Sequence, residues 1–209
     1  MEKRDNYATQ AAQAKALFLS YDQESLIRKL RIPSDEDYLY PTMLGFPYRI
    51  SRRTGDISRR EGKNWMDGNS YDEVMTLLNL VCDSREDRSV SGQWKDMKSF
   101  GLMFHQNLLE DQRNPTAERY DADPEGFIRA CQALHGEKLP FGDISFAVEL
   151  FDGLKIAMVL WRGDEEFPPR LRYFWDENAG QYIRYETMYF AVNLLRTVIS
   201  REMTGNAAP

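Results

Sequence analysis

Three consecutive acidic residues are the first candidates for chemistry in this sequence. Asp164, Glu165 and Glu166 lie in the stretch 160–175, which reads LWRGDEEFPPRLRYFW. Carboxylates bind hard cations or act as general bases when further ligands converge on them. The string is also typical of a turn, because Gly-Asp favours a turn and each proline fixes its own φ. Both interpretations stay open: a metal-assisted hydrolase site, or a stiff and soluble loop.

Histidine and tryptophan supply the remaining candidate site residues. His105 and His135 are the only histidines, and neither lies within a helical turn of a cysteine or of the other, so the sequence has no zinc signature. His135 precedes Gly136, where it can bond the last carbonyls of a helix. His105 is either a half-buried helix residue or a functional one. Trp94 and Trp161 are interpreted either as walls of a ligand cleft or as core residues.

The familiar catalytic and nucleotide-binding motifs are absent from the sequence. It contains no Walker loop, no dinucleotide-binding glycine pattern, no nucleophile elbow and no kinase motif. Catalytic residues and cofactors therefore remain unassigned, no metal ligands are assigned, and it stays open whether the protein is an enzyme.

The stretch 48–63, YRISRRTGDISRREGK, holds the one concentration of basic residues. Its arginines are Arg49, Arg52, Arg53, Arg59 and Arg60. On a hairpin they alternate between the two faces, so we expect no single basic patch. They either protect a sheet edge from pairing with other chains or contact an anion or an acidic partner.

Composition narrows the class of protein. The chain has 209 residues, 42% hydrophobic and 29% charged, which is typical of a globular domain. A net charge of -6 disfavours nucleic-acid binding, and no segment is apolar over the roughly 20 residues that span a bilayer. The polar start, MEKRDNYATQ, is unlike a secretory signal, so we expect a cytoplasmic protein. Cys82 and Cys131 lie in apolar helical patterns and are expected to be buried, reduced thiols.

The elements that must position these residues fall into two similar series. The first has a helix over 6–20, a helix N-capped by Asp22, a hairpin within 38–60 around Gly45, and a helix opened by a Ser70–Glu73 capping box. The second has a helix N-capped by Asp123, an alternating strand over 144–150, an Asp-Gly turn, a return strand over 154–161, a third strand over 170–175 and a final helix from about residue 184.

The two series match each other at a constant offset. Gly45 corresponds to Gly153 and Gly55 to Gly163, both 108 residues apart, and DQESLIRK (22–29) resembles DPEGFIRA (123–130). We therefore predict two helix–hairpin–helix repeats, about 21–83 and 122–202, which share one core. The competing interpretation is that any two α+β hairpins look alike. In the repeat, RGDEE occupies the position of TGDIS, so Gly-Asp is a turn in both copies.

Four segments carry a resemblance to a known family. They are MLGFPYRIS (43–51), SGQWKDMKSFG (91–101), DPEGFIRACQALHG (123–136) and VLWRGDEEFPPRLRYFWDENAGQYI (159–183). They resemble an uncharacterised bacterial and archaeal family, domain of unknown function 3786. The resemblance implies no activity and no catalytic residue. Some relatives are joined to an iron–sulphur cluster domain, which implies anaerobic redox or one-carbon metabolism, but this chain lacks the four thiolates that a cluster usually takes.

The sequence thus predicts one α+β domain over residues 1–209, an antiparallel sheet with flanking helices and an internal duplication. The function stays unassigned. The leading hypothesis is a cytoplasmic, non-enzymatic ligand-binding or accessory domain with a small-molecule or protein partner. Its site is expected between the repeats, near Trp94, Trp161 and the loop 163–169. The alternatives are a metal-assisted hydrolase that uses residues 164–166, and a structural homodimer that extends its sheet between subunits.

Overall fold

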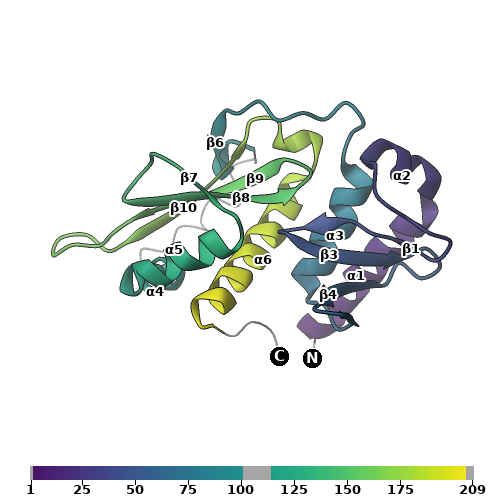
Figure 1. Cartoon of the computed structure of the whole chain (residues 1–209), viewed down its shortest axis with the longest axis horizontal. Coiled ribbons are helices and arrows are strands. Elements are labelled where there is room, and N and C mark those ends of the chain that lie inside the picture. The colour runs from purple at the N-terminus through teal and green to yellow at the C-terminus, as the bar shows by residue number, and fades with distance from the viewer. Residues whose placement is uncertain (1, 101–113, 206–209) are drawn as a thin grey trace. The chain divides into compact units, whose positions relative to one another are not determined.

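The computed structural model describes residues 2–100 and 114–205 (Figure 1). These residues form helices and antiparallel sheets, so the predicted α+β class is confirmed. The strands make two sheets, however, where the sequence suggested one. The chain divides into two compact units: residues 1–89 with 180–194, and residues 90–179 with 195–209. We describe each unit by itself.

The first unit combines helices with a small sheet. Its helices are α1 (Glu2–Ser20), α2 (Gln23–Leu30) and α3 (Tyr71–Asp83), and its strands are β1 (Tyr38–Leu39), β2 (Thr42–Met43), β3 (Phe46–Ser51), β4 (Ile57–Glu61) and β5 (Asn64–Met66). The strand order is β1-β3-β4-β5, and β2 also pairs with β3. Helices α1 and α3 pack against each other.

Local capping explains where the helices of the first unit begin. The Asp22 side chain accepts the backbone N–H of Glu24, and the predicted capping box between Ser70 and Glu73 is confirmed in both directions. These caps satisfy backbone N–H groups that a helix leaves without partners at its first turn. Helix α2 ends at Arg31, a non-glycine residue in the left-handed conformation with φ of 54°.

The second unit is built on a longer sheet. Its strands are β6 (Trp94–Asp96), β7 (Glu137–Lys138), β8 (Ile144–Phe151), β9 (Leu154–Trp161) and β10 (Arg170–Asp176), and its helices are the 3-10 helix η1 (Met97–Phe100), α4 (Pro115–Ala122) and α5 (Pro124–Ala133). The 3-10 helix η3 (Ala179–Gln181) and the helix α6 (Tyr185–Met203) each belong partly to the first unit and partly to the second. The strand order is β6-β10-β9-β8-β7. Helices α4 and α5 pack on this sheet. No helix within 2–100 or 114–205 is long and apolar enough to cross a membrane.

Most of the elements predicted for residues 123–203 are confirmed. Asp123 caps α5 by accepting the Gly126 N–H at 2.9 Å, and Pro124 occupies the first turn. Strand β9 lies between β8 and β10 and is buried along most of its length, as its continuous apolar sequence predicted. The helix end differs in detail. His135, and not Gly136, takes the left-handed conformation, with φ of 55°.

Both units contain a two-residue hairpin turn with the same backbone conformation. Leu44 and Gly45 have φ of 51° and 77°, and Asp152 and Gly153 have φ of 48° and 83°. Two successive positive φ values are typical of a type I′ turn, which suits the twist of antiparallel strands. The flanking pairs are Met43–Phe46 in the first unit and Phe151–Leu154 in the second. The two turns lie 108 residues apart, the offset noted in the sequence.

Candidate functional site

The two tryptophans of the predicted site lie on different strands, β6 and β9, and pair with opposite ends of β10. Trp94 pairs with Asp176 across β6 and β10, whereas Trp161 pairs with Arg170 across β9 and β10. Arg170 and Asp176 are six residues apart, about 20 Å at the usual rise of a strand. The two tryptophans are therefore separated along this sheet, and a cleft that includes both stays a prediction.

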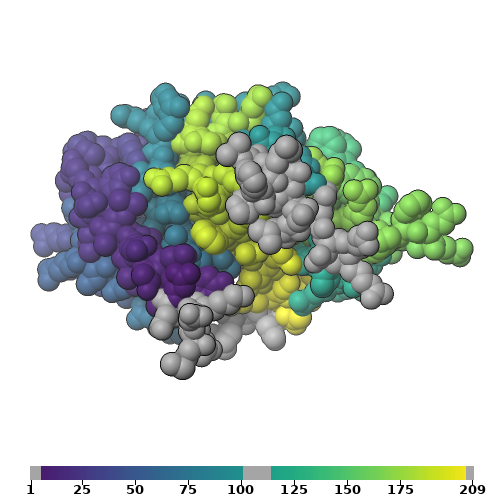
Figure 2. All heavy atoms as spheres, turned by 180° about the vertical axis from the view of Figure 1, so that it is seen from behind, coloured from purple at the N-terminus to yellow at the C-terminus, as the bar shows by residue number. Residues whose placement is uncertain are grey.

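The predicted acidic residues belong to the loop between β9 and β10, which projects from the sheet of the second unit (Figures 1 and 2). The Oδ1 atom of Asp164 accepts the backbone N–H groups of Glu166 at 2.9 Å and Phe167 at 2.8 Å. These two bonds hold the pKa of Asp164 below its ordinary value. Its carboxylate therefore stabilises a turn, which is one of the two interpretations that the sequence allowed.

The neighbours of Asp164 point to solvent. Glu165 and Glu166 are exposed, and the Phe167 side chain is 64% exposed. Within the described residues no three histidine, cysteine or acidic side chains come together in a group that could hold a metal ion. His105 lies outside the described residues. The metal-assisted hydrolase, in which at least two of the acids at 164–166 would meet His105 or another acid, thus remains a prediction.

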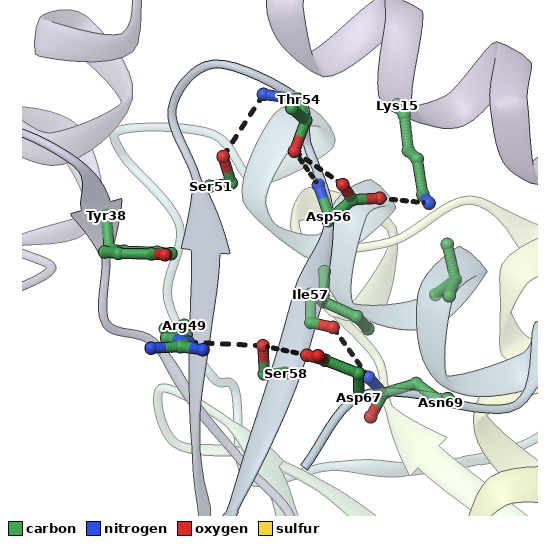
Figure 3. Close-up of a pocket in the computed structure, with 12 residues that line it drawn as sticks. Lys15, Tyr38, Arg49, Ser51, Thr54, Asp56, Ile57, Ser58, Asp67 and Asn69 are labelled. Carbon is green, nitrogen blue, oxygen red and sulfur yellow. Dashed lines mark hydrogen bonds and ion pairs between the residues drawn. The ribbon is translucent and has the colours of Figure 1, made fainter. Parts of the chain in front are cut away.

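A pocket of about 510 Å³ lies instead on the first unit, and we call it the hairpin pocket (Figure 3). Strands β3 and β4 and the turn between them form one wall. Lys15 of α1, Tyr38 of β1 and the segment 67–69 complete it. Pockets of this size hold small molecules. No local sequence pattern indicates this pocket, because its walls come from segments up to 59 residues apart in the chain, from Lys15 to Val74.

Strand alternation explains why the pocket is polar. Tyr48 and Ile50 of β3 are buried on one face of the sheet, so Arg49 and Ser51 must lie on the other. Arg49 pairs across the strands with Ser58 of β4. Ser58 is only 5% exposed although it is polar. This second face is therefore hydrophilic and partly covered, with Arg49 and Ser51 half-buried and Ser58 buried.

Arg49 is held by two aromatic rings and a hydroxyl group. Its guanidinium carbon lies 4.6 Å from the centre of the Tyr38 ring and 5.1 Å from that of Trp65. Its Nε atom donates to Ser58 Oγ at 3.2 Å. No carboxylate in residues 6–100 or 114–205 forms an ion pair with it. Aromatic faces attract a guanidinium and fix its plane without neutralising its charge.

The other end of the hairpin pocket is a closed hydrogen-bond network. Lys15 Nζ and Thr54 Oγ1 each donate to Asp56 at 2.6 Å. The bond from Lys15, followed by that from Thr54, lowers the pKa of Asp56. Gly55 lets helix α1 approach closely, since a Cβ there would lie 3.1 Å from Lys15 Cβ. Lysine and aspartate therefore neutralise each other at this end.

The five arginines do not all lie on one face: Arg49, Arg59 and Arg60 are on strands, whereas Arg52 and Arg53 lie in the turn after β3. Arg59 is turned to the other side, where its Nη1 and Nη2 atoms donate to Glu73 and Glu61 at 3.1 and 2.5 Å. Arg52 and Arg53 pair with other carboxylates, and Arg60 donates to a backbone carbonyl. Arg49 alone among the five lines the pocket. Strand alternation places Tyr38, Arg49 and Trp65 on the same face of the sheet, and this is the signal that could have identified Arg49.

An α+β fold with a polar pocket defines only a broad class, and comparison with known proteins narrows it. The family model described as Domain of unknown function (DUF3786) matches residues 22–197. The chain therefore belongs to this family, and the resemblance stated from four sequence segments is confirmed. No curated protein and no solved structure matches it. The family description assigns no activity, in agreement with the sequence prediction that no specific function can be named.

Proposed function

We propose that this chain is a ligand-binding domain and that a small polar molecule binds in the hairpin pocket of its first unit. The observation that carries the proposal is the state of Arg49. A guanidinium that lines a pocket, lies near two aromatic rings and makes no ion pair with a described residue is ready to bind an anionic group. The position differs from that expected from the sequence, which was near Trp94, Trp161 and the loop 163–169.

The geometry of the pocket supports binding without rearrangement. The pocket walls are held by internal bonds: Asn69 Nδ2 donates to the Ile57 carbonyl oxygen at 2.7 Å, and Ser51 Oγ accepts the Thr54 N–H at 3.2 Å. Walls that are already ordered lose little conformational freedom when a ligand binds, which favours affinity. Ser51 Oγ also accepts the Arg53 N–H, so its own proton is available for a ligand.

A ligand screen with chemical-shift mapping tests the proposal. We expect a metabolite panel to contain at least one compound that raises the melting temperature, because a ligand at 100 times its Kd adds about 2.7 kcal/mol to stability. Its chemical-shift changes should centre on the amides of Tyr38, Ser51, Asp67 and Asn69. Changes centred on Trp94 or Trp161 would instead support the sequence-predicted site, and a panel without any binder would contradict the proposal.

We also propose that the chain contains two copies of one helix–hairpin–helix unit. The equal turns at Leu44–Gly45 and Asp152–Gly153 support it, as do the equivalent strand pairs beside them. The second copy differs by the longer connection after β9, which holds the prolines at 168 and 169. An experimental structure in which residues 38–51 and 146–159 do not superpose would contradict the duplication.

A further inference from the structure

The charges in the hairpin pocket indicate which class of small molecule it binds, an inference that rests on the function proposed above. The Ser58 hydroxyl lies between two opposite charges. It accepts from Arg49 Nε at 3.2 Å and donates to Asp67 Oδ1 at 2.7 Å (Figure 3). A hydroxyl has one proton and two lone pairs, so the bond to Asp67 leaves Ser58 free to accept from Arg49.

Arg49 keeps most of its donors for a ligand. A guanidinium has five N–H groups, and only the one on Nε is used, by Ser58. Its terminal nitrogens make no hydrogen bond to any residue that the structure describes. A planar fork with free N–H groups matches the two oxygens of a carboxylate. The nearby rings of Tyr38 and Trp65 restrict the orientation of this fork.

Asp67 is the negative counterpart of Arg49. Its carboxylate lines the pocket and accepts the Ser58 hydroxyl through Oδ1. Among the described residues no lysine or arginine forms an ion pair with it, and its Oδ2 atom accepts no hydrogen bond. Lys15 and Asp56, in contrast, neutralise each other at 2.6 Å. The pocket therefore presents one unpaired positive group and one unpaired negative group, on either side of one serine oxygen.

We infer that the hairpin pocket binds a zwitterion of the α-amino acid class, with its carboxylate on Arg49 and its ammonium group on Asp67. An α-amino acid carries both groups on one carbon, so it can reach two partners that flank a single hydroxyl. A phosphate or dicarboxylate would bring a second negative charge toward Asp67, and a simple amine would leave Arg49 unpaired. The pocket volume of about 510 Å³ leaves room for the amino acid side chain.

The experiment compares each amino acid with two matched analogues. We would titrate the full chain with the common α-amino acids by calorimetry, and then test the α-amide and the deaminated acid of the tightest binder. The amide lacks the negative charge and the deaminated acid lacks the positive one. Each analogue should bind at least about 10-fold more weakly than the amino acid, as expected when one of two charge contacts is removed.

Two variants assign the charges to residues. Arg49→Gln should abolish the preference for the amino acid over its amide but keep the preference over the deaminated acid. Asp67→Asn should do the reverse. Arg49→Lys retains the charge without the fork, so it should reduce this preference without abolishing it, and it serves if Arg49→Gln does not fold. Arg60→Gln is the matched control, because Arg60 lies on β4 of the same sheet but is exposed and outside the pocket.

Each result has a defined meaning. The inference is supported if Arg49→Gln loses only the preference over the amide and Asp67→Asn loses only the preference over the deaminated acid. If phosphate or a dicarboxylate binds as tightly as the amino acids and shifts the amide resonances of the pocket, the amino acid inference is overturned, but the proposed ligand-binding function stands. Amino acid binding that Asp67→Asn leaves unchanged would overturn the assignment of the ammonium group. If no compound shifts the pocket amides, both the inference and the proposed function fail.

Discussion

The hydroxyl group of Tyr48 on β3 donates a 2.8 Å hydrogen bond to Oε1 of Glu73 on α3. Both residues are buried, with exposed fractions of 1% and 5%. The same Oε1 atom accepts from Arg59, while Oε2 accepts the Ser70 backbone N–H. Burial, followed by the neighbouring Glu73 carboxylate, raises the pKa of Tyr48. One carboxylate thus caps a helix and connects it to the sheet beneath the hairpin pocket.

This arrangement predicts unequal losses for two variants. Glu73→Ala should lower the free energy of unfolding by about 3–5 kcal/mol, because Arg59 then keeps only Glu61 as a partner in a buried position. Tyr48→Phe should lower it by about 1–2 kcal/mol, since the carboxylate loses one of several bonds. Urea denaturation measures both. Equal losses would show that Glu73 does not act as the centre of the network.

Two glycines allow a matched test of backbone strain against steric clash. Gly142 and Gly153 both have positive φ, 55° and 83°. A Cβ at Gly142 would lie 2.7 Å from Val159 Cγ1 and 2.9 Å from the Leu160 carbonyl oxygen, whereas at Gly153 nothing lies within 4 Å.

Gly153→Ala should therefore cost only the strain of the left-handed conformation, about 1 kcal/mol. Gly142→Ala adds the clash and should cost about 1–3 kcal/mol more. Thermal unfolding of both variants checks the order. If Gly142→Ala costs less stability than Gly153→Ala, the 139–143 loop can move to accept the added methyl group, and its close packing contributes little to the free energy of unfolding.

Asp176 is predicted to hold the start of β6 in place. This residue is 5% exposed, and its carboxylate accepts the backbone N–H groups of Ser91, Gly92 and Asn178 at 2.9, 2.7 and 2.9 Å. Asp176→Asn replaces one accepting oxygen by an amide nitrogen that cannot accept. The free energy of unfolding should fall by about 2–3 kcal/mol.

Hydrogen exchange distinguishes this local effect from general destabilisation. The amide of Ser91 or that of Gly92 should exchange faster in Asp176→Asn under native conditions, because the two amides donate to different oxygens of Asp176 and asparagine keeps only one accepting oxygen. The neighbouring Glu177→Gln serves as the control, since the Glu177 side chain is half-exposed and, among the residues that the structure describes, forms an ion pair only with Lys95. Unchanged exchange at both amides would refute the role assigned to Asp176.

The two cysteines predict a loss of stability in alkali. Cys82 and Cys131 are 5% and 0% exposed, as the sequence predicted for buried thiols. Burial raises the pKa of Cys82 from 9.0 to about 12, and it raises the pKa of Cys131 as well. Between these values the unfolded chain releases its thiol protons while the folded chain retains them. Stability is therefore full below pH 9 and falls as the pH rises toward 12.

Two measurements check this behaviour. The urea midpoint of the wild type should decrease from pH 8 to pH 11, and a Cys82→Ala, Cys131→Ala variant should show a shallower decrease. Some decrease should remain in this variant, because burial also raises the pKa values of the tyrosines at 48 and 120. A thiol reagent should react slowly with the native protein at pH 8 and quickly in urea. Rapid labelling of the native protein would contradict the burial of these thiols.

The sequence by itself predicted the helix caps, the Asp152–Gly153 hairpin, the strand 154–161 and the family. These features depend on residues only a few positions apart, such as Ser70 with Glu73, so local hydrogen bonds and alternation specify them. The position of the candidate site did not follow in the same way. The aromatic and acidic residues near 160–175 looked distinctive, yet Asp164 uses its carboxylate to close a turn.

Only the tertiary structure decided which distant segments meet. Strand β6 pairs with β10, more than seventy residues later, and this register separates Trp94 from Trp161. Lys15 of helix α1 reaches Asp56, which directly precedes β4, and Arg49 of β3 meets Tyr38 of β1 and Trp65 of β5. Such contacts form because whole apolar faces pack against one another, and that packing depends on the sum of many side chains rather than on any local motif. The chemistry of Arg49 was visible in the sequence, but the pocket around it was not.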